Sequence, residues 1–395
     1  MFEHVENYPG DPILSLMDDY QRDERAQKVN LSIGFYYDER GQVPVLNSVR
    51  RAKALVDMQP AMANLYLPME GHPGFRKAVQ TYLFGEREAM DDARICTIQS
   101  LGGSGALRVG ADFLKRYYPT SQVWVSDPTW DNHVAIFANA GFQVNRYPYL
   151  DECGKDIDFV RMINVFDSLP ANSIVLLHAC CHNPTGMDLS AQQWDTLYAL
   201  FRKRSIIPFL DAAYLGLGSG LPEDVYSIRA LARSGIAGLV SNSFSKVFSL
   251  YGERVGSLSV ICESVDIAQR VMGQLKGTVR ANYSNPPRHG AELVATIFSN
   301  ADLSASWREE LDAMRTRMLQ MRQALFDKVK ALNPTLDVGY LLKQKGMFSY
   351  TGLHAEAVDR IRERHGVYLI RSGRMCVAGL NDSNLEAVAE ALSDL

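Results

Sequence analysis

Five short segments rich in β-branched and other apolar residues recur through the middle of the chain, and they constrain its fold more than any other feature. They are residues 122–126, 173–178, 206–211, 238–242 and 256–262. Turn residues bound each segment, and the segments are nearly continuous apolar runs rather than strict alternations. Runs of this kind are typical of strands that are buried on both faces of a parallel sheet.

Amphipathic segments separate these strands. Residues 190–203 form one of them, and it opens with Ser190 and Gln193 at the spacing of a capping box, in which two side chains satisfy backbone amides of the first helical turn. The alternation of strand and helix predicts right-handed crossovers. It therefore predicts an α/β fold with a mostly parallel central sheet and helices on both faces.

The C-terminal part of the chain has a different pattern. Residues 302–333 predict one long helix, and the strand-like segments 346–353 and 372–380 follow it, separated by a helical segment at 355–364. We expect a smaller α+β domain here, completed by the first forty or so residues.

Composition and charge exclude several classes of protein. The 47% hydrophobic and 22% charged residues suit a globular chain with a large core. A net charge of -4 without a polybasic run argues against nucleic acid or an anionic membrane as a partner. No apolar stretch has the length of a membrane helix, and the first residues do not resemble a secretory signal. Six scattered cysteines suggest neither a disulfide framework nor a metal site, so we expect a cytoplasmic protein without a metal.

Polar loops follow several of the predicted strands, where open α/β sheets bind their ligands. Residues 102–107 combine three glycines with a serine and open a helix, so their amides suit a phosphate. An ordinary tight turn is the alternative. Lys246 lies between serines and apolar residues just after strand 238–242, where desolvation would lower its pKa and make it a nucleophile. Most lysines are solvated surface groups, but the serines and the downstream Arg254 suit a phosphate.

Two further loops carry polar groups. Asp211 ends an apolar strand; such a carboxylate is usually a helix cap or a surface group, but it also suits the protonated ring nitrogen of an electron-sink cofactor. Residues 182–186, HNPTG, follow strand 173–178 and taken alone would be a turn.

Taken together, these motifs resemble one family. Residues 181–186 (CHNPTG), 241–256 (SNSFSKVFSLYGERVG), 279–287 (VRANYSNPP) and 372–379 (SGRMCVAG) resemble the aspartate/aromatic branch of the class I aminotransferases of fold type I. The motifs occur in the family's order and spacing, and the resemblance covers essentially the whole chain. It implies an N-terminal arm and first part of the small domain at 1–43, a large domain that binds pyridoxal 5'-phosphate at 44–313, and the rest of the small domain at 314–395.

The resemblance also implies roles for residues around the cofactor ring. Lys246 would form the internal aldimine with pyridoxal phosphate and then carry a proton between the substrate Cα and the cofactor C4′. Asp211 would keep the pyridine nitrogen protonated. Tyr214 and Asn183 would hydrogen-bond the 3-oxygen of the cofactor, and Trp130 would stack on its ring.

By the same resemblance, the phosphate would be bound by Gly103, Ser104, Ser243, Ser245, Arg254 and, from the neighbouring subunit, Tyr66. His133 and His178 would orient Asp211, although each also suits an ordinary core histidine. Arg374 would bind the substrate α-carboxylate, with the Gly34 backbone on the other side, and Trp130 and Asn183 would also bind the substrate.

Arg280 of the neighbouring subunit would bind the distal carboxylate of a dicarboxylic substrate, which implies a homodimer with shared active sites. The small domain of this family closes over the substrate and expels water.

The choice between branches depends on the pocket surroundings. Residues 35–37 (FYY) and 65–71 (LYLPMEG) look like those of aromatic-amino-acid aminotransferases, and an apolar wall favours a phenyl ring at roughly 25 cal/mol per Å² of buried area. We therefore predict ping-pong exchange of amino groups between aromatic (phenylalanine, tyrosine, with tryptophan as a further candidate) or dicarboxylic (aspartate, glutamate) amino acids and 2-oxo acids such as 2-oxoglutarate. The family commonly has glutamine and phenylalanine where this chain has Leu215 and Leu217, which leaves the substrate range and rate open.

Three alternatives stay open: an aspartate-specific aminotransferase, a lyase of the same fold type, and a sensor that binds pyridoxal phosphate without turnover. The paired Arg280 and Arg374 favour transamination over a lyase, and the charge balance argues against a DNA-binding sensor.

Overall fold

The structure, a computed structural model, describes residues 1–7, 10, 12–58, 65–85, 93–152 and 154–394. Contacts between residues divide the chain into two compact units. One is Pro44–Thr316, and the other is Met1–Val43 together with Arg317–Leu395. Among the described helices, none has both the length and the apolar character needed to cross a membrane.

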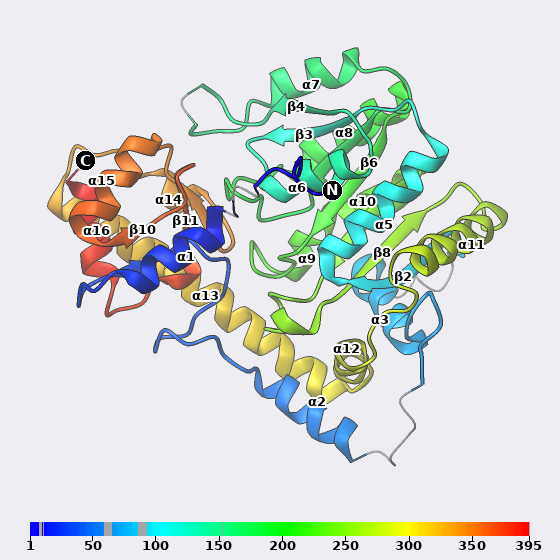
Figure 1. Cartoon of the computed structure of the whole chain (residues 1–395), viewed down its shortest axis with the longest axis horizontal. Helices are drawn as coiled ribbons and strands as arrows, with labels where there is room; N and C mark the ends of the chain where they lie inside the picture. Colours follow the sequence, from blue (N-terminus) through cyan, green and yellow to red (C-terminus); the bar gives the residue numbers. More distant parts are fainter. Residues whose placement is uncertain (8–9, 11, 59–64, 86–92, 153, 395) are drawn as a thin grey trace. The chain divides into compact units, whose positions relative to one another are not determined.

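A seven-stranded sheet forms the centre of the Pro44–Thr316 unit (Figure 1). In spatial order its strands are β2 (Ile95–Leu101), β8 (Val255–Ile261), β7 (Gly238–Ser243), β6 (Ile207–Ala212), β5 (Ile174–His178), β3 (Val123–Asp127) and β4 (Val144–Pro148). The five predicted strands are confirmed within one residue at each end. The sequence reasoning missed β2 and β4. β4 lies at the sheet edge and its residues 144–146 are only partly buried or exposed, so it lacks the continuous apolar run of a central strand.

The direction of β8 corrects one expectation. The segment was expected among parallel strands, but β8 pairs antiparallel with both β7 and β2, while β4, β3, β5, β6 and β7 are mutually parallel. Only residues 244–254 connect β7 to β8, and a parallel return needs a crossover of a dozen or more residues. Both kinds of strand are buried on both faces here, so their apolar runs look alike.

Helices cover both faces of the sheet. On β5, Ile174 and Leu176 pack in a cluster with residues of α5 (Gly102–Tyr117) and α11 (Val265–Asn282), two helices in mutual contact. Val175 and Leu177 point to the opposite face and are equally buried, at 0% and 1% exposure. The other helices of this unit are α2 (Asn47–Asp57), α3 (Pro73–Phe84), α6 (Asp131–Asn139), α7 (Phe159–Ser168), α8 (Ala191–Arg204), α9 (Leu221–Asp224), α10 (Tyr226–Ser234), α12 (His289–Ser299) and a short turn at Tyr251–Glu253.

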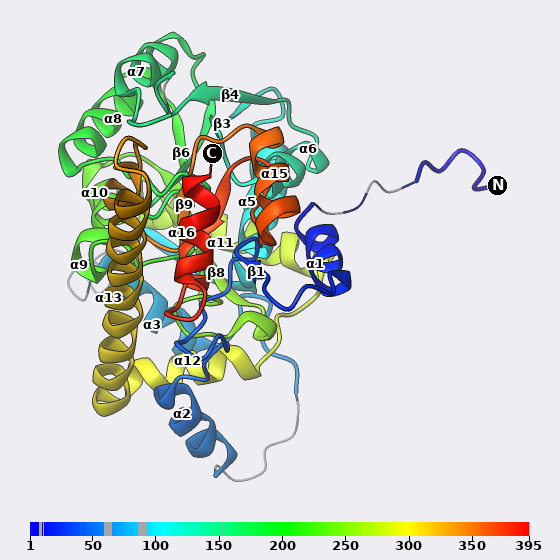
Figure 2. The same cartoon turned by 90° about the vertical axis from the view of Figure 1, so that its left-hand side faces the viewer.

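The start of α8 confirms the capping box. Ser190 Oγ accepts a hydrogen bond from the Gln193 amide at 3.2 Å, and Gln193 Oε1 accepts one from the Ser190 amide at 2.8 Å. Along its length, α8 lies beside α7 (Figure 2). Phe201 of α8 packs edge-on against Phe166 of α7.

The Met1–Val43 and Arg317–Leu395 unit has its own core. Its elements are α1 (Pro12–Arg22), β1 (Val29–Asn30), α14 (Tyr340–Lys343), β9 (Phe348–Tyr350), α15 (Ala355–His365), β10 (Val367–Tyr368), β11 (Arg374–Cys376), a short turn at Val377–Gly379 and α16 (Leu385–Ser393). β1 pairs with β10 and β9 with β11, so the N-terminal residues do complete this unit. The long helix predicted at 302–333 is α13 (Ala301–Leu332), which is continuous in Figures 1 and 2.

Candidate active site

The carboxyl ends of three neighbouring parallel strands bring together side chains that are far apart in the sequence. His178 of β5 lies opposite Asp211 of β6, and Asp211 lies opposite Ser241 of β7. Asn183, Tyr214 and Lys246 follow these strands in the same order. The sheet register therefore places this group of polar residues at one edge, where ligands bind in α/β folds.

Asp211 is a buried carboxylate, 7% exposed, held from two sides. Its Oδ2 lies 3.0 Å from His133 Nε2, and its Oδ1 accepts a hydrogen bond from Ser241 Oγ at 3.2 Å. Burial alone would raise the pKa of Asp211, but the hydrogen bond with His133 and the nearby Lys246 amine hold that pKa below its usual value. Asp211 is thus an ionised group at neutral pH.

The histidines near Asp211 pack against each other with tilted rings. His133 is completely buried, and its Nδ1 is 2.9 Å from Thr129 Oγ1. The His178 ring lies 4.9 Å from that of His133. Burial, followed by the neighbouring His133, lowers the pKa of His178 to about 3, so His178 is neutral. Trp130 packs edge-on against His133 with their ring centroids 5.1 Å apart.

Lys246 lies in the turn after β7, between apolar anchors. Phe244, Val247 and Phe248 are at most 1% exposed. Trp307 donates a hydrogen bond to the Val247 carbonyl at 2.8 Å and stacks on Phe248. The Lys246 amine is 5.2 Å from the centre of the Tyr214 ring. The turn therefore holds a half-buried amine in a fixed place beside a phenol.

A group of hydrogen-bond donors surrounds the first turn of α5. Leu101 precedes the helix and offers no side-chain cap, so the first amides, which include those of Gly103 and Ser104, are open to an anion. Arg254 Nη1 donates to Ser245 Oγ at 3.2 Å. A Cβ on Gly102 would come within 2.6 Å of Arg254 Nη2, which shows how closely the guanidinium approaches the helix.

On the other side of that turn, a Cβ on Gly103 would lie 3.2 Å from Ser243 Cβ. Helix amides, two serines and an arginine are the donor set of a phosphate site. A phosphate group, a basic ring nitrogen beside Asp211 and an aldehyde within reach of Lys246 all belong to pyridoxal phosphate, so these residues fit that cofactor. Asn183 and Tyr214, each 5% exposed, occupy the loops after β5 and β6.

Two predicted residues of the same unit lie on its surface instead. Tyr66 is 91% exposed. Arg280 lies in the exposed last turn of α11 and donates a hydrogen bond to Ser284. Within the described residues, neither forms a hydrogen bond with the group around Lys246.

Arg374 and Gly34 belong to the other unit, where they share a neighbour. Arg374 is 5% exposed; its Nη2 donates to the Ser32 carbonyl at 2.6 Å, and its guanidinium lies 4.4 Å from the centre of the Phe348 ring. A Cβ on Gly34 would come within 2.9 Å of Phe348 Cζ, so the backbone at this point approaches the ring closely.

Sequence reasoning missed several supporting residues. Ser241 and Thr129 hydrogen-bond Asp211 and His133, yet neither stands out in a single sequence. His182 was noted only as part of a turn motif. It stacks on Tyr149 at 3.9 Å and joins Ser126 Oγ to Thr185 Oγ1, each 2.8 Å from one of its ring nitrogens.

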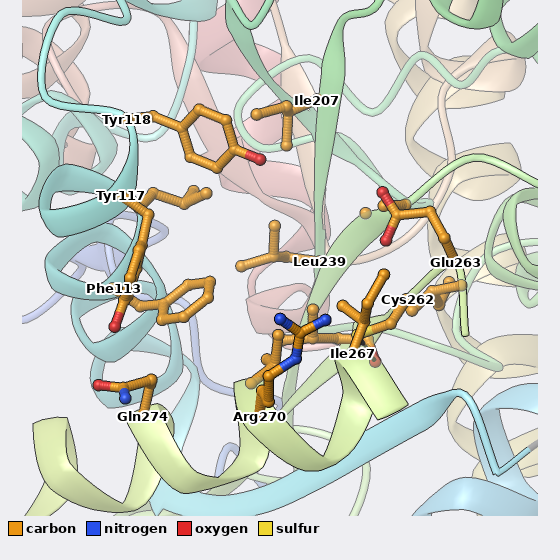
Figure 3. A pocket seen from close by; sticks show the side chains of 16 residues that line it. Phe113, Tyr117, Tyr118, Ile207, Leu239, Cys262, Glu263, Ile267, Arg270 and Gln274 are labelled. Carbon is orange, nitrogen blue, oxygen red and sulfur yellow. Dashed lines mark hydrogen bonds between the residues drawn. The ribbon is translucent and has the colours of Figure 1, made fainter. Parts of the chain in front are cut away.

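A separate pocket lies at the amino-terminal ends of β6 and β7, at the end of these strands opposite to Asp211 and Lys246 (Figure 3). Its volume is about 400 Å³ and its wall is mostly apolar. Phe113 and Tyr117 of α5 line one side, and Ile267, Arg270 and Gln274 of α11 line another. It contains none of the predicted site residues.

Comparison with known proteins shows to which family the chain belongs. The family model described as aminotransferase class I and II matches residues 26–392. A tyrosine aminotransferase of Klebsiella pneumoniae is 57% identical over 392 residues, covering 99% of each chain. The aromatic-amino-acid aminotransferase of Escherichia coli K12 is 57% identical over 394 residues, covering 100% of this chain and 99% of the relative. An aspartate aminotransferase of Pseudomonas aeruginosa is 45% identical, covering 99% and 98%.

Solved structures agree with this placement. An aromatic amino acid aminotransferase from Burkholderia cenocepacia superposes with a TM-score of 0.96 at 54% identity, covering 100% of this chain and 98% of that one. One from Burkholderia pseudomallei, covalently bound to pyridoxal phosphate, has a TM-score of 0.96 at 44% identity, covering 100% and 99%. One from Psychrobacter, cocrystallised with aspartic acid, has a TM-score of 0.97 at 47% identity, with the same coverage. The chain therefore belongs to the class I and II aminotransferases, enzymes that depend on pyridoxal phosphate.

Proposed function

We propose that this enzyme exchanges amino groups between aromatic or dicarboxylic amino acids and 2-oxo acids such as 2-oxoglutarate, by a ping-pong mechanism. The observation that carries the proposal is the meeting of Lys246, the ionised Asp211 and a phosphate donor set at one sheet edge. The relatives named above for tyrosine, aromatic amino acids and aspartate support this substrate range.

Two residues hold or move the protons of the reaction. Pyridoxal phosphate, when bound, supplies an electron sink for the negative charge that develops at the substrate Cα. Asp211 holds a proton on the cofactor ring nitrogen, because an ionised carboxylate beside that nitrogen favours its charged form. The Lys246 amine takes the proton from the substrate Cα and returns it to the acceptor carbon. The hydrogen bond from Trp307 to the Val247 carbonyl fixes the turn that carries Lys246, so the amine stays within reach of the carbon that loses the proton and the carbon that gains it.

The remaining residues around Lys246 bind and orient the cofactor. Asn183 and Tyr214 hydrogen-bond its ring oxygen, and Trp130 stacks on its ring. The phosphate is bound by Gly103, Ser104, Ser243, Ser245, Arg254 and the partner subunit's Tyr66. The open amides of α5 and the guanidinium of Arg254 support this assignment.

Two arginines select the substrate. Arg374 and the Gly34 backbone bind the α-carboxylate, Trp130 and Asn183 also bind the substrate, and Arg280 of the partner subunit binds a distal carboxylate. The high exposure of Tyr66 and Arg280 supports a homodimer in which each residue contributes to the active site of the neighbouring subunit.

We further propose that residues 44–313 form the cofactor-binding domain and that residues 1–43 and 314–395 form the small domain. We also propose that the enzyme is cytoplasmic.

A product assay tests the proposed reaction. The cofactor-loaded enzyme is incubated with phenylalanine and 2-oxoglutarate, and then with aspartate and 2-oxoglutarate, and the products are separated by chromatography. We expect glutamate and the matching 2-oxo acid in equal amounts from both donors. Glutamate formed with aspartate but not with phenylalanine would establish the aspartate-specific alternative. Cleavage of the amino acid without glutamate would indicate a lyase. The absence of any product would indicate a sensor that binds pyridoxal phosphate without turnover.

A further inference from the structure

One buried carboxylate holds the loop that follows Tyr214. Asp224, the last residue of α9, is 4% exposed. Its Oδ2 accepts hydrogen bonds from the amides of Gly216 at 2.8 Å and Gly218 at 2.9 Å, and its Oδ1 accepts one from the amide of Ser219 at 2.9 Å. Three amides of a five-residue loop, 215–219, thus converge on a single side chain.

The loop has little room to rearrange around this carboxylate. Leu215 and Leu217 are each 1% exposed, and the Leu217 amide donates to the Tyr214 carbonyl at 2.9 Å. Gly216 has a φ of +93°, and a Cβ there would come within 2.5 Å of Leu311. A Cβ on Gly218 would lie 2.8 Å from Asp224 Oδ1. The position of the Tyr214 backbone is therefore coupled to the position of the Asp224 carboxylate.

A second carboxylate holds the neighbouring loop in the same way. Asp188 accepts hydrogen bonds from the amides of Cys181 and His182, at 2.8 and 2.9 Å, just before Asn183. Cys181 Sγ in turn lies 3.9 Å from the Tyr214 carbonyl.

Burial raises the pKa of Asp224 to about 6. The nearby Asp188 raises this pKa further, and the three amide hydrogen bonds oppose the rise.

We propose that Asp224 is a positioning residue that sets the distance between the Tyr214 hydroxyl and the cofactor ring oxygen. The inference rests on the proposed role of Tyr214. A hydrogen bond from Tyr214 stabilises the ionised ring oxygen, and so favours the deprotonated form of the bound cofactor. If Asp224 acts through Tyr214, disturbing it must raise the pH at which the bound cofactor changes colour.

Two variants disturb the contact in different ways. Asp224→Asn keeps the shape but replaces one acceptor oxygen by a donor that faces the loop amides. Gly218→Ala keeps the charge and pushes on Asp224 Oδ1, at 2.8 Å, and also on Cys181 Sγ, at 3.0 Å, at a position where the backbone φ permits alanine. A shift that both variants share is therefore assigned to Asp224. The matched control is Asp195→Asn, an exposed carboxylate that accepts a hydrogen bond from Tyr226.

The measurement is an absorbance titration of the cofactor-loaded protein from acid to alkaline pH, without substrate. We expect Asp224→Asn and Gly218→Ala each to raise the midpoint by about half to one pH unit, the range of one lost hydrogen bond. Asp195→Asn should leave it unchanged. In a Tyr214→Phe background, neither variant should raise the midpoint further, because the group through which Asp224 acts is gone.

Three distinguishable results would contradict either the positioning role of Asp224 or the role of Tyr214 on which it rests. Equal shifts in the presence and in the absence of the Tyr214→Phe substitution would show that Asp224 acts on the cofactor by another route. No shift in folded Asp224→Asn and Gly218→Ala proteins would remove its positioning role. A midpoint that Tyr214→Phe itself leaves unchanged would instead contradict the proposed function of Tyr214. If Asp224→Asn fails to fold, Gly218→Ala carries the test alone.

Discussion

At the scale of single residues, the site consists of charged groups whose protonation is fixed by their surroundings. Asp211 stays ionised although burial raises its pKa, because the hydrogen bond with His133 and the nearby Lys246 amine lower that pKa. His178 stays neutral because burial and the neighbouring His133 disfavour its charged form and lower its pKa to about 3. An ionised acid and a neutral histidine side by side are what a site needs to hold one proton on a bound ring nitrogen.

The pKa of His178 makes a prediction about stability. Its folded pKa, about 3, lies below the ordinary value of 6.5, so the unfolded chain binds a proton that the folded chain excludes between these values. His178 therefore makes stability rise with pH across that window, by up to about 1.4 kcal/mol per pH unit. Replacing it with glutamine should reduce the loss of stability between pH 6.5 and 4.

Urea unfolding of the cofactor-free protein, measured at several pH values for the wild type and His178→Gln, checks this. Parallel pH profiles for the two proteins would contradict the prediction. Asp224 acts in the opposite sense, because its pKa is raised to about 6: its contribution to stability is full below the ordinary value of 3.8 and is lost progressively as pH rises through 6.

The sequence led to the residues that end strands and to those that the family resemblance names. Asp211 ends a buried apolar strand and Lys246 follows another, but each alone also suits an ordinary surface group, and only the combined motifs and the family resemblance single them out. Ser241, Thr129, Asp188 and Asp224 do not stand out, since their importance comes from hydrogen bonds to residues distant in sequence or to backbone amides. Such contacts depend on sheet register and loop path, which no local pattern specifies.

At the scale of helices and strands, local signals predicted positions but not directions. The capping box located the start of α8 correctly because its two hydrogen bonds form within four residues. The antiparallel direction of β8 depends on the path of residues 244–254 and was not apparent from its apolar residues. That direction matters because it leaves Arg254, the residue just before β8, at the same end of the strands as Lys246.

The cap of α8 gives an element-scale prediction. Ser190→Ala removes the acceptor of the Gln193 amide and should lower the free energy of unfolding by about 1 kcal/mol. Ser168→Ala is the matched control, because its hydroxyl donates to the Val165 carbonyl at the other end of a helix. Urea unfolding of both variants measures the loss in the free energy of unfolding. Equal losses for Ser190→Ala and Ser168→Ala would contradict a stabilising role of the capping box.

At the scale of the whole molecule, the central expectation is that the active site is shared between two subunits. Tyr66 and Arg280 are exposed in a single chain, although the family resemblance gives each a role at the site. In a hybrid dimer of one Lys246→Ala subunit and one Arg280→Leu subunit, one site would have its own Lys246 and its partner's Arg280. That site would be intact.

We therefore expect the hybrid, purified with two different tags, to regain roughly half of wild-type aspartate turnover. The Arg280→Leu homodimer should lose roughly 100-fold in aspartate kcat/KM, because a substrate carboxylate loses its charged partner, and should lose little with phenylalanine. A hybrid no more active on aspartate than either homodimer would show that Arg280 acts within its own subunit or not at all.

The central claim is that Lys246 carries out amino transfer from both aromatic and dicarboxylic amino acids. A single-turnover absorbance experiment on the cofactor-loaded enzyme tests it most directly, with aspartate, glutamate, phenylalanine and tyrosine added one at a time and no oxo acid present. We expect all four donors to convert the cofactor to its pyridoxamine form in the wild type, and none to do so in Lys246→Ala. Conversion by no donor, or conversion by the Lys246→Ala protein at a comparable rate, would contradict it.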